Sequence, residues 1–370
     1  MKKSVFYYDT IFLYASLQSV GHTMEYFARH TKKLVVYIIM PRVNGGTNAL
    51  RVYDRGILTH EHSVGSSTNI FFYYFLWWYH HNLFLLQYFS RLEHVLVFGG
   101  HPVAFIGMSV MKLLRSVEYA YWIGDYFPPV HWSLILFEKL KKYYHDRVSY
   151  TYYLSDRINK IFNGKVVRLA NKKTVMWGVK PYTGSKKQIT SSFKLLFVGA
   201  IRPSQGIEDL LLFIKNTPKV ELSIIGVCEK NLFEKYNSLL IKYKISDRVW
   251  FPNRFVDDDE LKKIAKVHHV GIALYEKGEY TATHYTDPGK VKTYIEMGLP
   301  VIMTNTSAIA PYIKHYMAGE LIDEVAEFAV ALKRIKRRCG AYQKGVHAFA
   351  QCFEYEKYYS QALAVLEKAG

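Results

Sequence analysis

Apolar and polar residues alternate in blocks that predict strands and helices in turn along the chain. In the first half, apolar runs predict strands at residues 4–8, 34–39, 94–98, 119–123, 148–154 and 166–169. Helices are predicted at residues 22–30, 70–89, 103–115, 132–144 and 155–162. Residues 41–69 are predicted to form a polar loop with one short strand. This alternation is typical of a doubly wound α/β domain.

The alternation resumes after a polar stretch at residues 181–193, which is predicted to be a linker between two domains. Strands are predicted at residues 194–198, 220–226, 249–251, 268–274 and 301–303. Helices are predicted at residues 207–216, 231–242, 257–265, 290–297, 310–316, 328–340 and 353–368. The pattern thus predicts an N-terminal domain at 1–180, a second α/β domain at 194–340 and a helical segment at 341–370.

The charge of the chain favours partners that carry phosphate. The 370 residues have a net charge of +18, and residues 1–180 hold 22 lysines and arginines against 10 acids. Such a balance suits an anionic membrane, a nucleic acid or a phosphorylated substrate. No nucleic-acid motif is present and the basic residues are scattered, so nucleic acid is not expected as a partner.

The three cysteines, Cys228, Cys339 and Cys352, have no short spacing. This pattern argues against a disulfide scaffold or a zinc site and fits a reducing compartment. We expect neither a metal nor a cofactor. The apolar N-terminus is interrupted by polar residues and has no clear cleavage site, so it does not predict a signal peptide.

Residues 70–89 form an unusually aromatic segment, in which eleven of twenty residues are Phe, Tyr or Trp. The segment is barely long enough to span a bilayer, and His80, His81, Asn82 and Gln87 interrupt it. Two interpretations stay open. The segment is a core helix of the first domain, or it is an interfacial helix whose exposed tryptophans, Trp77 or Trp78, anchor it to lipid.

Residues 287–302 predict a loop, a short helix, a tight turn and a buried strand. Asp287-Pro288-Gly289 favours a turn before the helix, and Gly298 is a good C-cap after it. A lysine at the N-terminus of such a helix, Lys290, is suited to bind an anion, because the helix dipole favours negative charge there. The alternative is a surface turn with a solvated lysine.

A second candidate for phosphate binding is the loop at residues 199–206, between a predicted strand and helix. Gly199 would let backbone N–H groups approach phosphate oxygens. Arg202 could reach two phosphate oxygens at once, or it could be a surface arginine.

These two segments resemble the donor-binding segments of GT-B glycosyltransferases, closest to glycosyltransferase family 4 and to bacterial polysaccharide sugar transferases. In the segment at residues 287–302, the matching positions are Lys290, Tyr294, Gly298, Pro300, Val301 and Ile302. The pattern departs from the family at Tyr285 and Thr293, where glutamates are usual, and at Ala200 and Gln205, where the family has Arg and Lys. The resemblance covers residues 194–325 well and residues 1–180 in layout only.

The resemblance implies a GT-B fold, in which two doubly wound Rossmann-like domains face a cleft and the last helix crosses back to the first domain. The first domain would bind the acceptor, and the second would bind a UDP- or GDP-type nucleotide diphosphate sugar. The donor-binding residues implied are Gly199, Arg202, Ser204, Gln205, Arg254, Lys290, Thr293 and Tyr294. His101 and Asp125 follow strands of the first domain, where ligand groups gather, and are the candidate catalytic residues.

The function expected is metal-independent transfer of a sugar to a glycan or lipid-linked acceptor in the synthesis of surface polysaccharide or glycoconjugate. The expected location is the cytoplasm, with peripheral binding to the inner face of the plasma membrane as an option. A sugar-nucleotide epimerase and a non-catalytic binding protein on the same fold remain as alternatives. The sequence does not fix the sugar, its stereochemical outcome or the oligomeric state.

Overall fold

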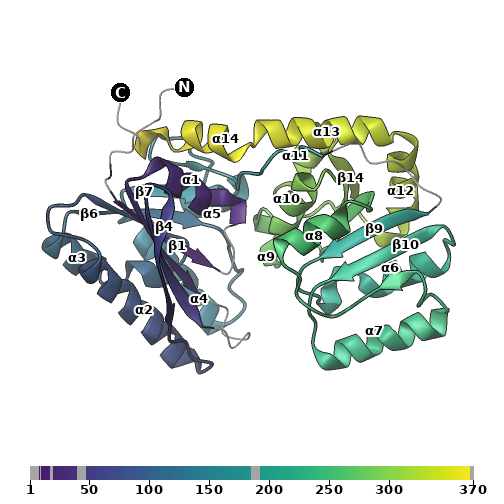
Figure 1. Ribbon diagram of the computed structural model, residues 1–370, viewed down its shortest axis with the longest axis horizontal. Coiled ribbons are helices and arrows are strands. Elements are labelled where there is room, and N and C mark those ends of the chain that lie inside the picture. The colour runs from purple at the N-terminus through teal and green to yellow at the C-terminus, as the bar shows by residue number, and fades with distance from the viewer. Residues whose placement is uncertain (1–7, 9, 17–19, 40–46, 185–191, 367–370) are drawn as a thin grey trace. The chain divides into compact units, whose positions relative to one another are not determined.

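The computed structural model describes residues 8, 10–16, 20–39, 47–184 and 192–366 (Figure 1). The chain divides into two compact units. Unit 1 comprises the residues up to Gly178 together with those from Tyr355 onward, and unit 2 comprises Val179–Glu354. Each unit is a sheet covered by helices, which confirms the predicted α/β fold class.

Unit 1 contains an eight-stranded sheet in the order β4-β3-β2-β1-β5-β6-β7-β8. Its strands are β1 (Thr10–Ser16), β2 (Lys33–Ile39), β3 (Asn48–Asp54), β4 (Ile57–Val64), β5 (Val95–Gly99), β6 (Val117–Ile123), β7 (Tyr150–Tyr153) and β8 (Lys172–Thr174). All neighbours are parallel except β2 with β3 and β3 with β4. The strand order reverses between β1 and β5, and ligands bind near such points in doubly wound sheets.

The helices of unit 1 begin and end close to the predicted positions. They are η1 (Val20–His22), α1 (Thr23–His30), α2 (Ile70–Gln87), η3 (Pro102–Phe105), α3 (Met108–Leu114), α4 (Trp132–His145), α5 (Asp156–Asn163), α14 (Tyr355–Ala362) and η6 (Ala364–Leu366). Local caps explain two of the starts, because Asn69 Oδ1 accepts from Phe71 N at 3.0 Å and Ser155 Oγ accepts from Ile158 N at 3.1 Å.

Helix α14 belongs to unit 1 because its side chains bond to the N-terminal part of the chain. The buried Tyr359 hydroxyl donates to Gly21 O at 2.6 Å and accepts from Gly178 N at 2.8 Å. Glu356 pairs with Arg29 at 2.7 Å and with His30 at 2.8 Å.

Unit 2 contains a six-stranded sheet in the order β11-β10-β9-β12-β13-β14, and all of its pairs are parallel. Its strands are β9 (Phe193–Val198), β10 (Val220–Ile225), β11 (Val249–Trp250), β12 (Val270–Ala273), β13 (Val301–Thr304) and β14 (Gly319–Ile322). The strand order reverses between β9 and β12. The sheet is a doubly wound one, as predicted.

The helices of unit 2 cover an apolar core to which all six strands contribute, and Phe197, Ile224 and Ile272 are fully buried in it. They are η4 (Pro203–Gln205), α6 (Ile207–Lys215), α7 (Lys230–Tyr243), α8 (Asp258–Ala265), α9 (Ala282–Tyr285), α10 (Gly289–Glu296), α11 (Ala310–His315), η5 (Val325–Glu327), α12 (Phe328–Arg337) and α13 (Cys339–Cys352).

Four strand predictions differ from the structure. The first strand is Thr10–Ser16, in a segment predicted to be a loop, whereas residues 4–7 lie outside the described residues. Residues 48–64 form a hairpin of two strands, because Arg55 and Gly56 take the left-handed conformation that a tight turn requires. β8 lies at Lys172–Thr174 rather than 166–169, and β14 was not predicted.

Helix α2 confirms the helix predicted at residues 70–89, but the two tryptophans named as anchors do not face outward together. Trp77 is buried, and the Trp78 indole donates to Ile106 O at 3.2 Å. In the described part of the chain, no helix has both the length and the hydropathy to cross a bilayer.

Candidate active site

The side chain of Lys290 lies at the carboxyl edge of the unit 2 sheet, at the switch point between β9 and β12. Its Nζ is 4.2 Å from the centre of the Phe197 ring in β9 and 5.5 Å from that of Tyr275, two residues after β12. The Nζ is buried, and the described part of the chain offers it no hydrogen-bond partner. The predicted anion-binding lysine is therefore an enclosed amine and not a solvated surface lysine.

The electrostatic state of Lys290 follows from this enclosure. Burial, and secondarily repulsion from Arg202, lowers the pKa of the Lys290 amine to about 7. Two aromatic faces stabilise a cation only weakly compared with a carboxylate. An anionic group beside the amine would restore its charged form.

Gly199 leaves room beside this amine. A Cβ at Gly199 would lie 3.5 Å from Lys290 Cε and 3.7 Å from its Nζ. Gly199 also has a φ of +117°, and Gly226, at the end of β10, packs so closely that a Cβ there would lie 1.9 Å from Gly199 O. The two glycines let the loops after β9 and β10 meet next to Lys290.

The loop at residues 199–206 presents one further cation. Arg202 is exposed, and it lies near enough to Lys290 to affect its pKa. Gln205 folds back, and its Oε1 accepts from Arg202 N at 3.3 Å, while Ser204 is exposed on the same turn. Of the residues predicted in this loop, Gly199 and Arg202 lie near the Lys290 amine. Gln205 instead stabilises the loop through its bond to the backbone.

The loop after β11 is held by a residue that sequence reasoning missed. Asn253 has a φ of +47°, and its Oδ1 accepts from Cys228 N at 2.9 Å, which ties this loop to the one after β10. Arg254, predicted to bind the donor, forms a two-pronged ion pair with Glu260, with Nη1 2.9 Å from Oε2. This pairing raises the pKa of Arg254 and occupies its guanidinium.

Tyr294 and Thr293 do not offer their hydroxyls to a ligand. The fully buried Tyr294 hydroxyl donates to Ile272 O at 2.9 Å and accepts from Val198 N at 2.8 Å, so it bridges β12 and β9. Thr293 Oγ1 donates to Gly289 O at 3.2 Å in the same helix. We therefore correct the role of Tyr294 from binding the donor to positioning α10 on the sheet.

A buried ion pair fixes the start of α10. Lys292 Nζ lies 3.3 Å from Asp287 Oδ2, and both side chains are almost fully buried. Burial lowers the pKa of Lys292, and the aspartate opposes this effect. The pair was not predicted, because residues five apart across a turn have no periodic signal in the sequence.

In unit 1, His101 follows β5 and lies among aromatic rings. Its ring centre is 4.5 Å from that of Trp77, 5.8 Å from that of Tyr74 and 5.1 Å from that of Phe137. Its Nδ1 accepts from Val103 N at 3.3 Å and caps η3. Burial, and secondarily the charge of Lys141, lowers the pKa of His101 to about 3, so the imidazole is neutral and weakly basic.

Asp125 lies on an exposed loop after β6, and two buried residues of α4 hold this loop. Lys141 Nζ donates to Asp125 O and to Glu138 Oε1, the latter at 2.9 Å. Glu138 Oε1 also accepts from Phe127 N at 3.2 Å. The structure thus places Asp125 and His101 around the same helix, with Lys141 as a residue that the sequence did not suggest.

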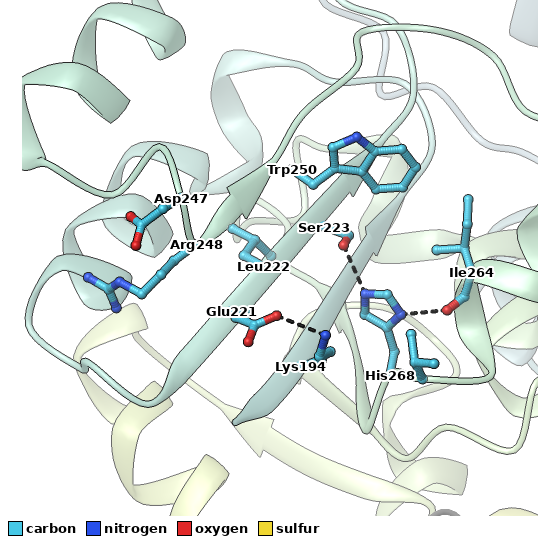
Figure 2. A pocket seen from close by; sticks show the side chains of 10 residues that line it. Lys194, Glu221, Leu222, Ser223, Asp247, Arg248, Trp250, Ile264 and His268 are labelled. Atoms are coloured by element: carbon cyan, nitrogen blue, oxygen red, sulfur yellow. Dashed lines mark hydrogen bonds and ion pairs between the residues drawn. The ribbon is translucent and has the colours of Figure 1, made fainter. Parts of the chain in front are cut away.

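A pocket with a volume of about 270 Å³ lies elsewhere in unit 2, toward the amino ends of β9 and β10 (Figure 2). Four of its polar side chains are engaged with one another in pairs. His268 bonds to Ser223 Oγ at 2.9 Å and Ile264 O at 2.7 Å, and Lys194 pairs with Glu221 at 3.0 Å. The pocket is separate from the Lys290 site, which lies at the opposite ends of the strands. Among the described residues, no group of three potential metal-binding side chains occurs.

Solved structures share this architecture over most of the chain. A sucrose-phosphate synthase from Thermosynechococcus elongatus is 13% identical, with a TM-score of 0.70 over 96% of this chain and 98% of that chain. HepE from Anabaena, solved with UDP and glucose, is 14% identical, with a TM-score of 0.69 over 97% and 99%. The pneumococcal O-GlcNAc transferase GtfA, solved with UDP and GlcNAc, is 13% identical, with a TM-score of 0.58 over 86% and 73%. These likenesses establish the fold as GT-B.

Residues 231–365 match a family model described as "Glucosyltransferase 3-like, C-terminal domain". The match includes Lys290 and the whole of α10. Together with the fold, it confirms the prediction, made from residues 199–206 and 287–302, of a GT-B glycosyltransferase. No curated protein sequence matches the chain.

Proposed function

We propose that this protein transfers a sugar from a nucleotide diphosphate sugar, of the UDP type, to a glycan or lipid-linked glycan. The observation that carries the proposal is the buried Lys290 amine, which has no hydrogen-bond partner among the described residues and lies at the switch point of the unit 2 sheet. A UDP-type donor is supported by HepE and GtfA, both of which were solved with UDP.

The chemistry of the Lys290 site fits a diphosphate. Lys290 and Arg202 repel each other, and an anion between them would relieve that repulsion and restore the charge of Lys290. Transfer of the sugar leaves an additional negative charge on the departing diphosphate. Cations placed in advance in an enclosed site stabilise this charge most strongly, and they can do so without a metal ion.

On the acceptor side, we assign the proton-accepting role to Asp125 in preference to His101. A general base must reach the acceptor proton, but the His101 ring is enclosed by Trp77 and Phe137, and its Nδ1 already accepts from Val103 N. Asp125 is exposed on its loop, and Lys141 and Glu138 hold the backbone around it. His101 would shape the site through its aromatic neighbours.

The proposed location is the cytoplasmic face of a membrane. The excess of basic residues in 1–180, 22 against 10 acids, supports attraction to anionic lipid, where each exposed Lys or Arg contributes about 1 kcal/mol.

The test is release of nucleotide and transfer of label from a panel of radiolabelled UDP-sugars with a membrane extract as acceptor. Lys290→Ala should lower kcat/KM by the equivalent of about 2–4 kcal/mol, the range for losing one preorganised charge donor. Lys314→Ala removes an exposed lysine of the same unit and should leave turnover unchanged.

Other outcomes of this assay separate the alternatives. An epimerase would convert the donor sugar without net nucleotide release, and a binding protein would retain UDP without turnover. Asp125→Asn should lower transfer with UDP affinity preserved, and a parallel loss of both would refute its acceptor-side role. Normal transfer by Lys290→Ala would refute the donor-site assignment.

A further inference from the structure

Three helices of unit 1 expose large apolar side chains that a water-soluble surface does not require. On α2, the exposed fractions are 82% for Phe71, 63% for Phe72 and 52% for Phe75. Leu113 on α3 is 87% exposed, and Trp132 at the start of α4 is 78% exposed. We call the outward sides of α2, α3 and α4 the aromatic face.

The three helices are neighbours in unit 1, and α2 contacts the residues just before α3. The Trp78 and Asn82 side chains of α2 both donate to Ile106 O, at 3.2 and 3.5 Å, and Figure 1 shows α2 and α3 next to each other. Helices α2 and α4 meet around His101, which contacts Trp77 on one and Phe137 on the other. The exposed side chains therefore come from neighbouring elements.

The apolar area involved is large for a monomer. An aromatic side chain has about 150–250 Å² of surface, so the four aromatic residues above expose on the order of 500 Å², and Leu113 adds to this area. Patches on water-soluble monomers seldom exceed a few hundred Å², and larger ones mark interaction sites. Helix α2 has no charged residue in its 18 positions, and the exposed side chains of its first half are apolar or aromatic.

The charges on the aromatic face select its partner. The exposed charged side chains within α2, α3 and α4 are Lys112, Lys139 and Lys142, and the acid within these helices, Glu138, is largely buried and paired with Lys141. Lys142 pairs with the exposed Asp146, which directly follows α4. A face with aromatic side chains and a net positive exposed charge complements an anionic lipid surface. In a twofold dimer through this face, the lysines would face copies of themselves, which is unfavourable.

We propose that the aromatic face binds the surface of an anionic membrane, with α2 lying in the plane of the interface. This inference deepens the proposed membrane location, but it does not rest on the transfer reaction. Helix α2 would insert Phe71 and Phe75 among the acyl chains near the headgroups, as interfacial helices do. Trp77 and Trp78 would instead hold α2 to the rest of unit 1.

Co-sedimentation of the full chain with vesicles tests the proposal. The protein should pellet with vesicles of phosphatidylcholine mixed with phosphatidylglycerol, less with phosphatidylcholine alone, and less in high salt. The triple variant Phe71→Ser, Leu113→Ser, Trp132→Ser should partition on the order of a hundredfold more weakly. Lys112→Gln with Lys139→Gln should lose most of the dependence on phosphatidylglycerol.

The matched control is the triple variant Leu212→Ser, Ile241→Ser, Val330→Ser, which removes exposed apolar side chains from unit 2 and should bind like the wild type. Far-UV circular dichroism and the thermal unfolding midpoint should match the wild type in all variants, which shows that both units are folded. Failure of the wild type to pellet, or equal binding by the Phe71 triple variant, would overturn the proposal. The proposal would also be overturned if the wild type is a dimer without lipid and the Phe71 triple variant is a monomer. The aromatic face would then bind a second copy of the chain.

Discussion

At Lys290, the fold holds an amine in surroundings that favour its uncharged form. Its pKa is lowered to about 7, so near and above neutral pH the unfolded chain binds more protons here than the folded protein does. Stability should therefore rise with pH above about 7, and the penalty should be largest at and below that value. Such a cost is common where binding requires a buried charge.

Lys290→Met should consequently stabilise the protein, by up to about 4 kcal/mol near neutral pH, because it keeps the side-chain length and removes the amine. The gain should shrink as the pH rises toward the ordinary pKa of lysine. Urea denaturation at several pH values measures the effect. A gain that does not change with pH, or a loss of stability, would show that the amine is not the source of the penalty.

Residue identity alone was a poor guide to contacts. Lys290 and Gly199 could be predicted because a lysine at a helix start and a glycine after a strand have specific physical uses. Arg254 and Tyr294 were implied by the same family resemblance. In the structure, however, the Arg254 guanidinium pairs with Glu260, and the Tyr294 hydroxyl bonds to two backbone groups. Such partners come from distant or unpatterned positions, and only the folded chain brings them together.

At the scale of elements, Tyr294 connects α10 to the sheet. Tyr294→Phe leaves Val198 N and Ile272 O without their side-chain partner, at a cost of about 1–3 kcal/mol for buried polar groups. Thermal unfolding should show this loss, while UDP affinity at low temperature should stay within a few-fold of the wild type. A large fall in affinity with normal stability would return Tyr294 to the list of donor-binding residues.

The Asp287–Lys292 pair fixes the turn before α10, and both partners are buried. Asp287→Ala should destabilise unit 2 by about 3–5 kcal/mol, because it leaves a buried charge without its partner. The double variant Asp287→Leu, Lys292→Met should recover much of this loss, since neither charge remains. Denaturant unfolding of the single and double variants checks the coupling, and additive losses would contradict it.

Five of the six strands of unit 2 were predictable because they are short apolar runs separated by caps and glycines, as at β9 and β10. The hairpin of β3 and β4 was not, since β4 is an exposed, polar edge strand and its residues do not alternate in the expected way. β1 begins at Thr10, a polar residue buried in the structure and bonded to Glu93 at 3.4 Å. Tertiary contacts of this kind override local pattern.

At the scale of the whole molecule, each unit is a sheet with a switch point, and a candidate functional group follows a strand next to it. Gly199 follows β9 and meets Lys290 in unit 2, and His101 follows β5 in unit 1. Residues 1–180 are rich in basic and aromatic residues, and in unit 1 some of these residues form the aromatic face on α2, α3 and α4. We propose that unit 2 binds the donor and that unit 1 contacts the acceptor and the lipid.

The central claim is that the Lys290 amine binds the donor diphosphate, and a crystal structure of the protein with UDP tests it most directly. The account predicts a phosphate oxygen within ion-pair distance of Lys290 Nζ, next to Gly199, with Arg202 turned toward the same phosphates. UDP bound away from Lys290, for instance in the pocket around His268, or a diphosphate held without contact to Lys290, would contradict it.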